Sequence, residues 1–203
     1  MQIVKIKSIR KIQSQSKRYD IEVANNNNFF ANNILVHNCS FFYHVPDKRF
    51  GVLGRTLELH EIFSNRYTDQ IERYDIKNKL IEFCTEENIS ICLRGESYGI
   101  GIQGLELNPH SKLPAGWAMF SVYLTEERRY ARKGDKYYFL NIAEKLNLPT
   151  VEIIAKDVVL TKEIIQHYSS GITELNGKPF EGVVVQHAEG SFKIINKHYD
   201  SKK

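Results

Sequence analysis

The tripeptide His37-Asn38-Cys39 combines three residue types that can rearrange a peptide bond. An asparagine side-chain amide can attack its own carbonyl carbon, which closes a succinimide ring and cleaves the chain after Asn38. A neighbouring histidine can protonate the leaving group or polarise the scissile carbonyl. A cysteine that follows can accept an acyl group as a thiolate nucleophile. The order suits acyl transfer and cleavage at the Asn38–Cys39 bond, although such a tripeptide also occurs by chance at a strand end.

Short alternating segments surround this tripeptide. Residues 3–7 and 19–23 alternate apolar and polar side chains, which predicts two half-buried strands joined by a polar stretch. The four asparagines at 25–28 favour a tight turn, and residues 34–36 resume a strand. Residues 1–38 carry a net charge of +4, whereas the remainder has 22 charges of each sign. The basic segment could attract an acidic partner chain or nucleic acid, and a solvated surface is the plainest interpretation.

The segment 29–38, Phe-Phe-Ala-Asn-Asn-Ile-Leu-Val-His-Asn, resembles the C-terminal blocks of inteins, as do residues 19–23 and the asparagine turn. The resemblance implies that residues 1–38 are the C-terminal fragment of a split intein and complete an all-β Hint-type fold with a separate N-intein. Cys39 would receive the N-extein as a branched thioester, Asn38 would cyclise, and Asp20 would help to activate these steps without a cofactor. Asn27 stands where the family often has histidine, which would weaken assistance to acyl transfer.

The remaining residues, 39–203, would then form the C-extein. Residues 40–43 and 50–53 predict a strand pair that turns through Pro46-Asp47. Helical spacing connects Phe63, Tyr67, Ile71 and Tyr74, and then Ile76, Leu80 and Phe83. Further strands are predicted at 90–94, 117–124, 151–159, 182–186 and 191–195, and helices at 137–146 and 162–169, the second capped by Thr161. This mixture predicts an α+β domain.

An ordered set of motifs runs through this second part. The set comprises Phe50–Leu59, Leu93-Arg94-Gly95-Glu96, Gly99–Gly104, Trp117-Ala118-Met119-Phe120, Phe180–Val185 and Ser191–Asn196. Together they resemble the covalent nucleotidyltransferases, and most closely the ATP-dependent RNA ligases.

The ligase resemblance implies a nucleotide site that uses ATP and magnesium. Arg55 and Lys193 would contact phosphate, Glu96 would accept hydrogen bonds from ribose hydroxyls, and Phe120 would stack on adenine. Glu181 would lie at the pocket rim and help to hold magnesium. Taken singly, each has a plainer interpretation, such as core packing for Phe120 or a buried strand start for Glu181.

The lysine that these enzymes adenylate belongs to a Lys-x-Asp/Glu-Gly motif, and this chain contains no such motif. Residues 40–43 match the strand that follows the motif in the family. We therefore expect the lysine at the end of the N-extein, carried by a separate N-intein precursor. Many ligases have a second lysine at the position of Ile195, and in this chain the next lysine is Lys197. Lys193 is therefore a stronger candidate than Lys197 for the phosphate contact.

The composition sets the broader context. Three cysteines without Cys-x-x-Cys spacing indicate free thiols in a reducing compartment. No apolar run reaches the ~18 residues of a membrane span and no signal peptide follows Met1, so we expect a cytoplasmic protein of a bacterial or phage-infected cell. After splicing, the ligase would act on RNA ends. A DNA ligase, or a residue 1–38 segment that docks without splicing, remains an alternative.

Overall fold

The computed structural model describes part of the chain and divides it into two compact units, residues 1–36 and 37–203. The described residues are 8–11, 19–22, 38–54, 58–59, 65, 67–100, 110, 112–170, 174–175, 178–179, 181–187 and 190–199.

In the first unit, strand β1 (Ser8–Lys11) pairs antiparallel with β2 (Tyr19–Glu22). Strand β2 agrees with the segment predicted at 19–23. Strand β1 falls in the stretch predicted to be a polar connection, so that prediction was wrong: residues 8–11 pair with residues 19–22 along both strands. The strands predicted at 3–7 and 34–36 lie outside the described residues.

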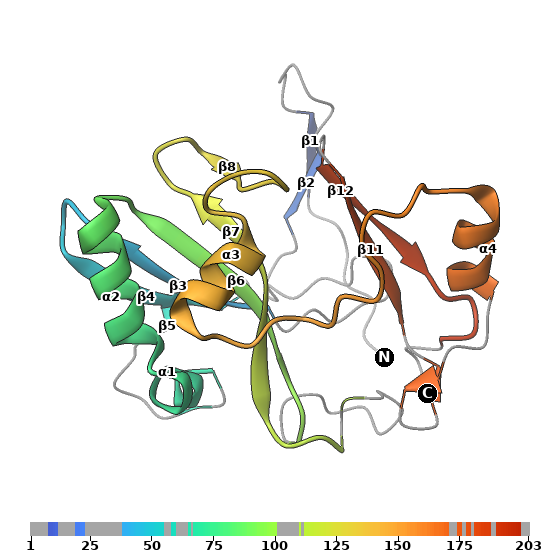
Figure 1. Cartoon of the computed structure of the whole chain (residues 1–203), viewed down its shortest axis with the longest axis horizontal. Helices are drawn as coiled ribbons and strands as arrows, with labels where there is room; N and C mark the ends of the chain where they lie inside the picture. The colour runs from blue at the N-terminus through green and yellow to red at the C-terminus, as the bar shows by residue number, and fades with distance from the viewer. Residues whose placement is uncertain are drawn as a thin grey trace. The chain divides into compact units, whose positions relative to one another are not determined.

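The second unit contains a six-stranded antiparallel sheet (Figure 1). Its order is β5-β4-β3-β6-β7-β8. The strands are β3 (Asn38–His44), β4 (Arg49–Leu53), β5 (Glu58–Leu59), β6 (Ile91–Tyr98), β7 (Gly116–Leu124) and β8 (Arg129–Tyr130). Strands β3 and β4 form the predicted hairpin, closed by a hydrogen bond from the Lys48 amide to the Val45 carbonyl (3.1 Å).

Helix α2 (Ile76–Glu87) packs against β3 and helix α3 (Phe139–Leu146) against β7, whereas helix α1 (Asp69–Tyr74) packs against α2. Helix α2 and the helix predicted at 137–146 agree with the structure. Asp75 separates α1 from α2 in a left-handed conformation (φ 52°), so the long helical spacing becomes two helices. Asn147 ends α3 in the same conformation, just before Pro149.

The sheet separates a packed face from an open face. In β6, residues 91, 93, 95 and 97 are buried, whereas the alternate residues 92, 94, 96 and 98 are half-buried. Trp117 lies on the packed face over Gly95, where an added Cβ would come within 2.2 Å of the indole ring. The Trp117 ring meets Phe41 edge to face, with centroids 5.2 Å apart. Gly95 is therefore required for tryptophan to fit against the sheet.

The predicted strand at 151–159 is wrong, because no strand forms there. Only its start touches the sheet: the Val151 amide donates to the Met119 carbonyl (3.0 Å), and Thr150 makes an isolated bridge to Met119. Residues 151–161 then continue in irregular conformation, with Asp157 left-handed (φ 56°) and Val159 80% exposed. High β-propensity does not form a strand without a partner.

The last part contains helix α4 (Lys162–Ser170) and the short strands β9 (Glu174–Leu175) and β10 (Lys178–Pro179). It ends in the antiparallel hairpin of β11 (Gly182–His187) and β12 (Gly190–Ile195), against which α4 packs. Thr161 caps α4 by accepting from the Ile164 amide (3.4 Å), as predicted. No helix in the described part of the chain is long and apolar enough to cross a bilayer.

Candidate functional site

Of the predicted nucleotide-binding residues, Phe120 lies at a β-bulge and Glu96 lies just beyond it on the neighbouring strand. Glu96 belongs to the open-face residues of β6. Strand β6 pairs with β7, where Ser121 lies opposite Arg94 and Met119 lies opposite Gly95. Phe120, between them in β7, therefore has no opposite residue in β6. A bulge of this kind bends the strand and redirects the extra side chain. The half-buried ring of Phe120 therefore belongs to a local irregularity beside Glu96 rather than to the regular ladder.

The β11–β12 hairpin is held against this bulge. Gln186 of β11 donates a hydrogen bond from Nε2 to the Phe120 carbonyl oxygen (3.3 Å). Its Oε1 accepts from the Tyr138 hydroxyl, at the start of α3 (2.9 Å). Alternate residues of a strand share a face, and Val184, which is opposite Lys193, lies on the face that carries Gln186. Lys193 is thus presented on the side of the hairpin that meets Phe120.

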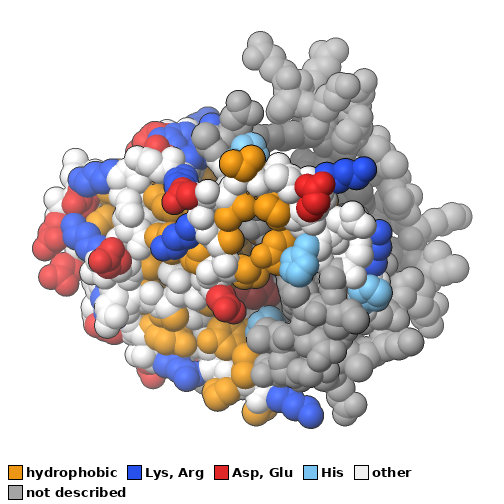
Figure 2. Space-filling view, turned by 45° about the vertical axis from the view of Figure 1, so that its right-hand side comes forward, with side chains coloured by type: hydrophobic (Ala, Val, Ile, Leu, Met, Phe, Trp, Pro, Cys, Tyr) orange, Lys and Arg blue, Asp and Glu red, His pale blue; other side chains and the backbone are white. Residues whose placement is uncertain are grey.

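Glu181 and Lys193 form an ion pair, with side chains 28% and 34% exposed. The Glu181 carbonyl accepts from the Asn196 amide (2.8 Å), which fixes the start of β11. At Gly182 an added Cβ would stand 2.0 Å from the Ile194 carbonyl oxygen, so glycine lets Glu181 approach β12 closely. Figure 2 brings this side of the molecule forward and shows apolar side chains beside acidic, basic and histidine side chains around a shallow hollow.

Glu181 also acts on residues near the end of β6. Burial lowers the pKa of His110, and the negative charge of Glu181 opposes that shift. The His110 ring lies 6.1 Å from the ring of Tyr98, two residues beyond Glu96. Burial, with the charge of Glu181 added, raises the pKa of Tyr199. The charge of Glu181 therefore acts on His110, whose ring lies beside that of Tyr98 at the end of β6, while Gln186 holds the hairpin at Phe120.

The predicted splice junction lies at the start of β3. Asn38 is the first residue of that strand and pairs with Glu96. The Cys39 side chain is 0% exposed, and its carbonyl accepts a hydrogen bond from Trp117 Nε1 (3.1 Å). Burial raises the pKa of the Cys39 thiol to about 12. In this fold Cys39 is a neutral core residue.

The other predicted site residues are described less fully. The backbone of Asp20 lies in β2 opposite Arg10. His37 and Arg55 lie outside the described residues.

The donor set fits a nucleotide better than a bare metal ion. Phe120 offers an aromatic ring, Glu96 a carboxylate and Lys193 an ammonium group, which are side-chain types that small-molecule sites use. Among the described residues, no group of three or more His, Cys, Asp or Glu side chains could hold a metal. Magnesium commonly keeps waters and substrate phosphates with only one or two carboxylates. Glu181 is compatible with that limited role.

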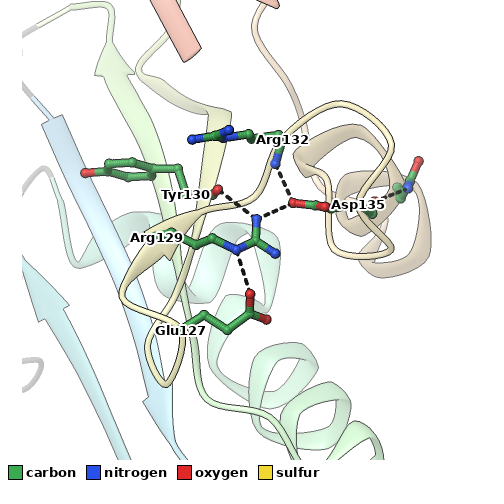
Figure 3. Close-up of polar contacts among 6 residues, drawn as sticks. Glu127, Arg129, Tyr130, Arg132 and Asp135 are labelled. Atoms are coloured by element: carbon green, nitrogen blue, oxygen red, sulfur yellow. Dashed lines mark hydrogen bonds and ion pairs between the residues drawn. The ribbon is translucent and has the colours of Figure 1, made fainter. Parts of the chain in front are cut away.

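Sequence reasoning named Arg94 only as part of a motif and gave it no role, and it missed the neighbours of Arg94 in β8. The signal was present, because Arg94 stands two residues before Glu96 and a strand places both on one face. Arg129 holds the β7–β8 turn together by donating to Glu127 (2.6 Å), to Asp135 (2.5 Å) and to the Tyr130 carbonyl (3.3 Å). Figure 3 shows these contacts, with the side chains of Tyr130 and Arg132 pointing away from Asp135. The network fixes the backbone of Tyr130 at the edge of the open face.

The RNA ligase family matches residues 36–199. The chain belongs to the RNA ligase family. The solved structures similar to it include a mutant RNA ligase of Naegleria gruberi with ATP and Mn, at 24% identity and a TM-score of 0.63. That alignment covers 80% of this chain and 47% of the ligase chain. No curated protein sequence matches the chain.

Two further structures of the Naegleria gruberi ligase agree. One with PPi matches at 23% identity and one mutant with AMP and Mn at 24%, with TM-scores of 0.63 and 0.62. Each alignment covers 79% of this chain and 47% of the ligase chain. At these identities the likeness shows the fold. The family and the mixed sheet-and-helix fold confirm the RNA ligase part of the sequence prediction, and this chain spans about half the length of the ligases it resembles.

Proposed function

We propose that this chain is a trans-splicing precursor whose residues from Cys39 onward complete an ATP-dependent RNA ligase. Membership of the RNA ligase family supports the ligase half of the proposal. The intein resemblance of residues 1–38 supports the splicing half, together with the absence of a Lys-x-Asp/Glu-Gly motif from the chain.

The observation that carries the proposal is the register of β3. Asn38 pairs with Glu96, so the chain that precedes Cys39 enters the sheet beside the candidate ribose-binding carboxylate. A lysine a few residues before Cys39 in the spliced product would therefore arrive next to the nucleotide site. Splicing would join the nucleophile to the pocket that serves it, and the unspliced chain would lack adenylation activity.

The chain's own residues would have distinct tasks in the spliced enzyme. Phe120 would stack on adenine, Glu96 would accept hydrogen bonds from the ribose, and Lys193 would neutralise phosphate charge as it develops. Glu181 holds Lys193 by an ion pair and would share its carboxylate with magnesium. The lysine amine would attack the α-phosphate of ATP, form a lysyl-AMP bond and release pyrophosphate. The RNA 5′-phosphate would then take the AMP and free the lysine, and a 3′-hydroxyl would attack that 5′-phosphate and release AMP.

The splicing half can be tested by mixing the chain with the neighbouring precursor that ends in an N-intein. A ligated product and a released fragment of residues 1–38 are expected. The double variant Asn38→Ala, Cys39→Ala should still bind the partner but release nothing. Binding without any ligation in the unmodified chain would identify residues 1–38 as a docking segment and contradict splicing.

The ligase half can be tested with labelled ATP. The spliced product should become covalently labelled and this chain alone should not. Label on residues 39–203 alone would contradict the assignment of the lysine to the partner. Nicked RNA and nicked DNA duplexes offered to the spliced product separate an RNA ligase from a DNA ligase that uses the same pocket.

A further inference from the structure

Arg94 lies between two aromatic rings on the open face of the six-stranded sheet. Its guanidinium carbon is 5.8 Å from the centroid of Phe120 and 5.4 Å from that of Tyr130. Its Nη1 donates a hydrogen bond to the Tyr130 hydroxyl (2.5 Å). Both ring distances are within the range of a cation–π interaction. Arg94 therefore joins Phe120 to Tyr130 through one charged group.

The bulge makes Phe120 dependent on such a contact. Because Phe120 is the extra residue between the Arg94–Ser121 and Gly95–Met119 pairs, no residue stands opposite it to pack against its ring. Gln186 fixes the Phe120 carbonyl, but that bond does not orient the ring. The contact that can orient the ring comes from Arg94 on the neighbouring strand β6.

Tyr130 gives Arg94 a fixed anchor. The Tyr130 carbonyl is held by Arg129, and its ring meets Tyr123 edge to face at 5.2 Å. Planar guanidinium groups stack on rings while donating hydrogen bonds in their own plane, which an ammonium group cannot do. Arg94 thus links the β7–β8 turn, which Arg129 holds, to the Phe120 side chain at the bulge.

We propose that Arg94 is a positioning residue for nucleobase recognition, which holds the Phe120 ring in place so that adenine can stack on it. The inference rests on the proposed nucleotide site. Arg94 acts on the base and not on the phosphates, so its loss should weaken binding of ATP and leave binding of inorganic tripolyphosphate unchanged. Loss of one exposed cation–π contact corresponds to about a two- to fivefold change in affinity.

The test measures ATP and tripolyphosphate binding to the full 203-residue chain by titration calorimetry. Arg94→Met keeps the aliphatic stem and should weaken ATP binding about two- to fivefold. Arg94→Lys keeps the charge and should lose less. A matched control is Arg49→Met, because Arg49 stacks on Phe42 in the same sheet at 5.4 Å and should leave ATP binding unchanged.

A double variant isolates the link to the ring. Arg94→Met should add nothing to the loss caused by Phe120→Leu, because both would remove the same stacking platform. Equal losses of ATP and tripolyphosphate, an unchanged ATP affinity in Arg94→Met, or fully additive losses in the double variant would each overturn the inference. Absence of ATP binding by the unmodified chain would contradict the nucleotide site itself, and the inference would fall with it.

Discussion

The sharpest prediction concerns the reactivity of Cys39 in the folded chain. Its thiol is 0% exposed and has a pKa raised from 9.0 to about 12 by burial. At about pH 8, a thiol with that pKa is about one part in ten thousand thiolate, against about one part in ten when unfolded. Since the thiolate is the reacting species, ionisation alone should slow alkylation of Cys39 by about a thousandfold.

The assay is timed alkylation with iodoacetamide at about pH 8, in native buffer and in guanidinium chloride, followed by mass spectrometry of the Cys39 peptide. Cys92 provides an internal reference, because it is half-buried and its pKa is raised less, to about 11. Cys92 should react before Cys39 in native buffer, and the two should react alike when unfolded. A native rate for Cys39 within about tenfold of its unfolded rate would refute the reasoning.

This prediction bears on the proposed splicing. Splicing requires the Cys39 sulfur to attack an acyl group on a partner chain, whereas the folded sheet buries that sulfur and ties the adjacent carbonyl to Trp117. We therefore expect trans-splicing to proceed from a state in which the first residues of β3 are undocked. Mixing with the partner after prior unfolding of the chain should give faster ligation than mixing with the chain already folded.

Three further predictions follow from the packing and the site. Gly95→Ala should cost about 2–3 kcal/mol in urea unfolding, because the added Cβ would lie 2.2 Å from the Trp117 ring; a cost below about 1 kcal/mol would contradict that geometry. Stability should fall as pH rises from about 9 to about 12, because Cys39 and Cys84 ionise at about 9.0 when unfolded but at about 12 when folded, so that the unfolded state binds fewer protons. The slope is at most about 1.4 kcal/mol per pH unit per thiol, and thermal melts of the Cys84→Ala variant should show a shallower decline. In the spliced product, Glu181→Gln should lower the rate of lysine adenylation about tenfold, because loss of a carboxylate weakens metal binding. A higher magnesium concentration should restore part of that rate, and a rate that does not respond to magnesium would argue against a role of Glu181 in holding the metal.

Local sequence patterns correctly predicted those strands and helices that have a regular spacing of apolar residues and also pack against another element. The β3–β4 hairpin, α2 and β7 follow from alternation or helical spacing, and each packs into one core. The segment 151–159 carries the same β-branched residues but lacks a partner beyond Val151, so composition alone misled. Strand β1 was missed because its four residues, Ser-Ile-Arg-Lys, carry little apolar pattern of their own, and the ladder forms only by pairing with β2.

The candidate site was predictable as a set of residue types but not as an arrangement. Motif order pointed to Glu96, Phe120 and Lys193. The bulge that isolates Phe120 arises from the register between two strands, which no single strand's pattern contains. The hydrogen bond from Gln186 to Phe120 likewise joins residues far apart in sequence. The register that sets Asn38 opposite Glu96 has the same origin.

Position 39 carries a constraint from two unrelated sources. A splicing junction of the proposed kind needs a side chain that can attack an acyl group, and the sheet needs a small side chain with no exposed surface in the core that also contains Trp117. Cysteine meets both needs, because a free thiol is a nucleophile when ionised and packs as a small hydrophobe when neutral. Serine would keep a nucleophilic oxygen but bury a hydroxyl. Alanine would fit the sheet but could not accept an acyl group. The cysteine that splicing leaves behind would therefore not disturb the core of the spliced enzyme. An intein of this kind would be tolerated only at positions of the fold that accept such a cysteine.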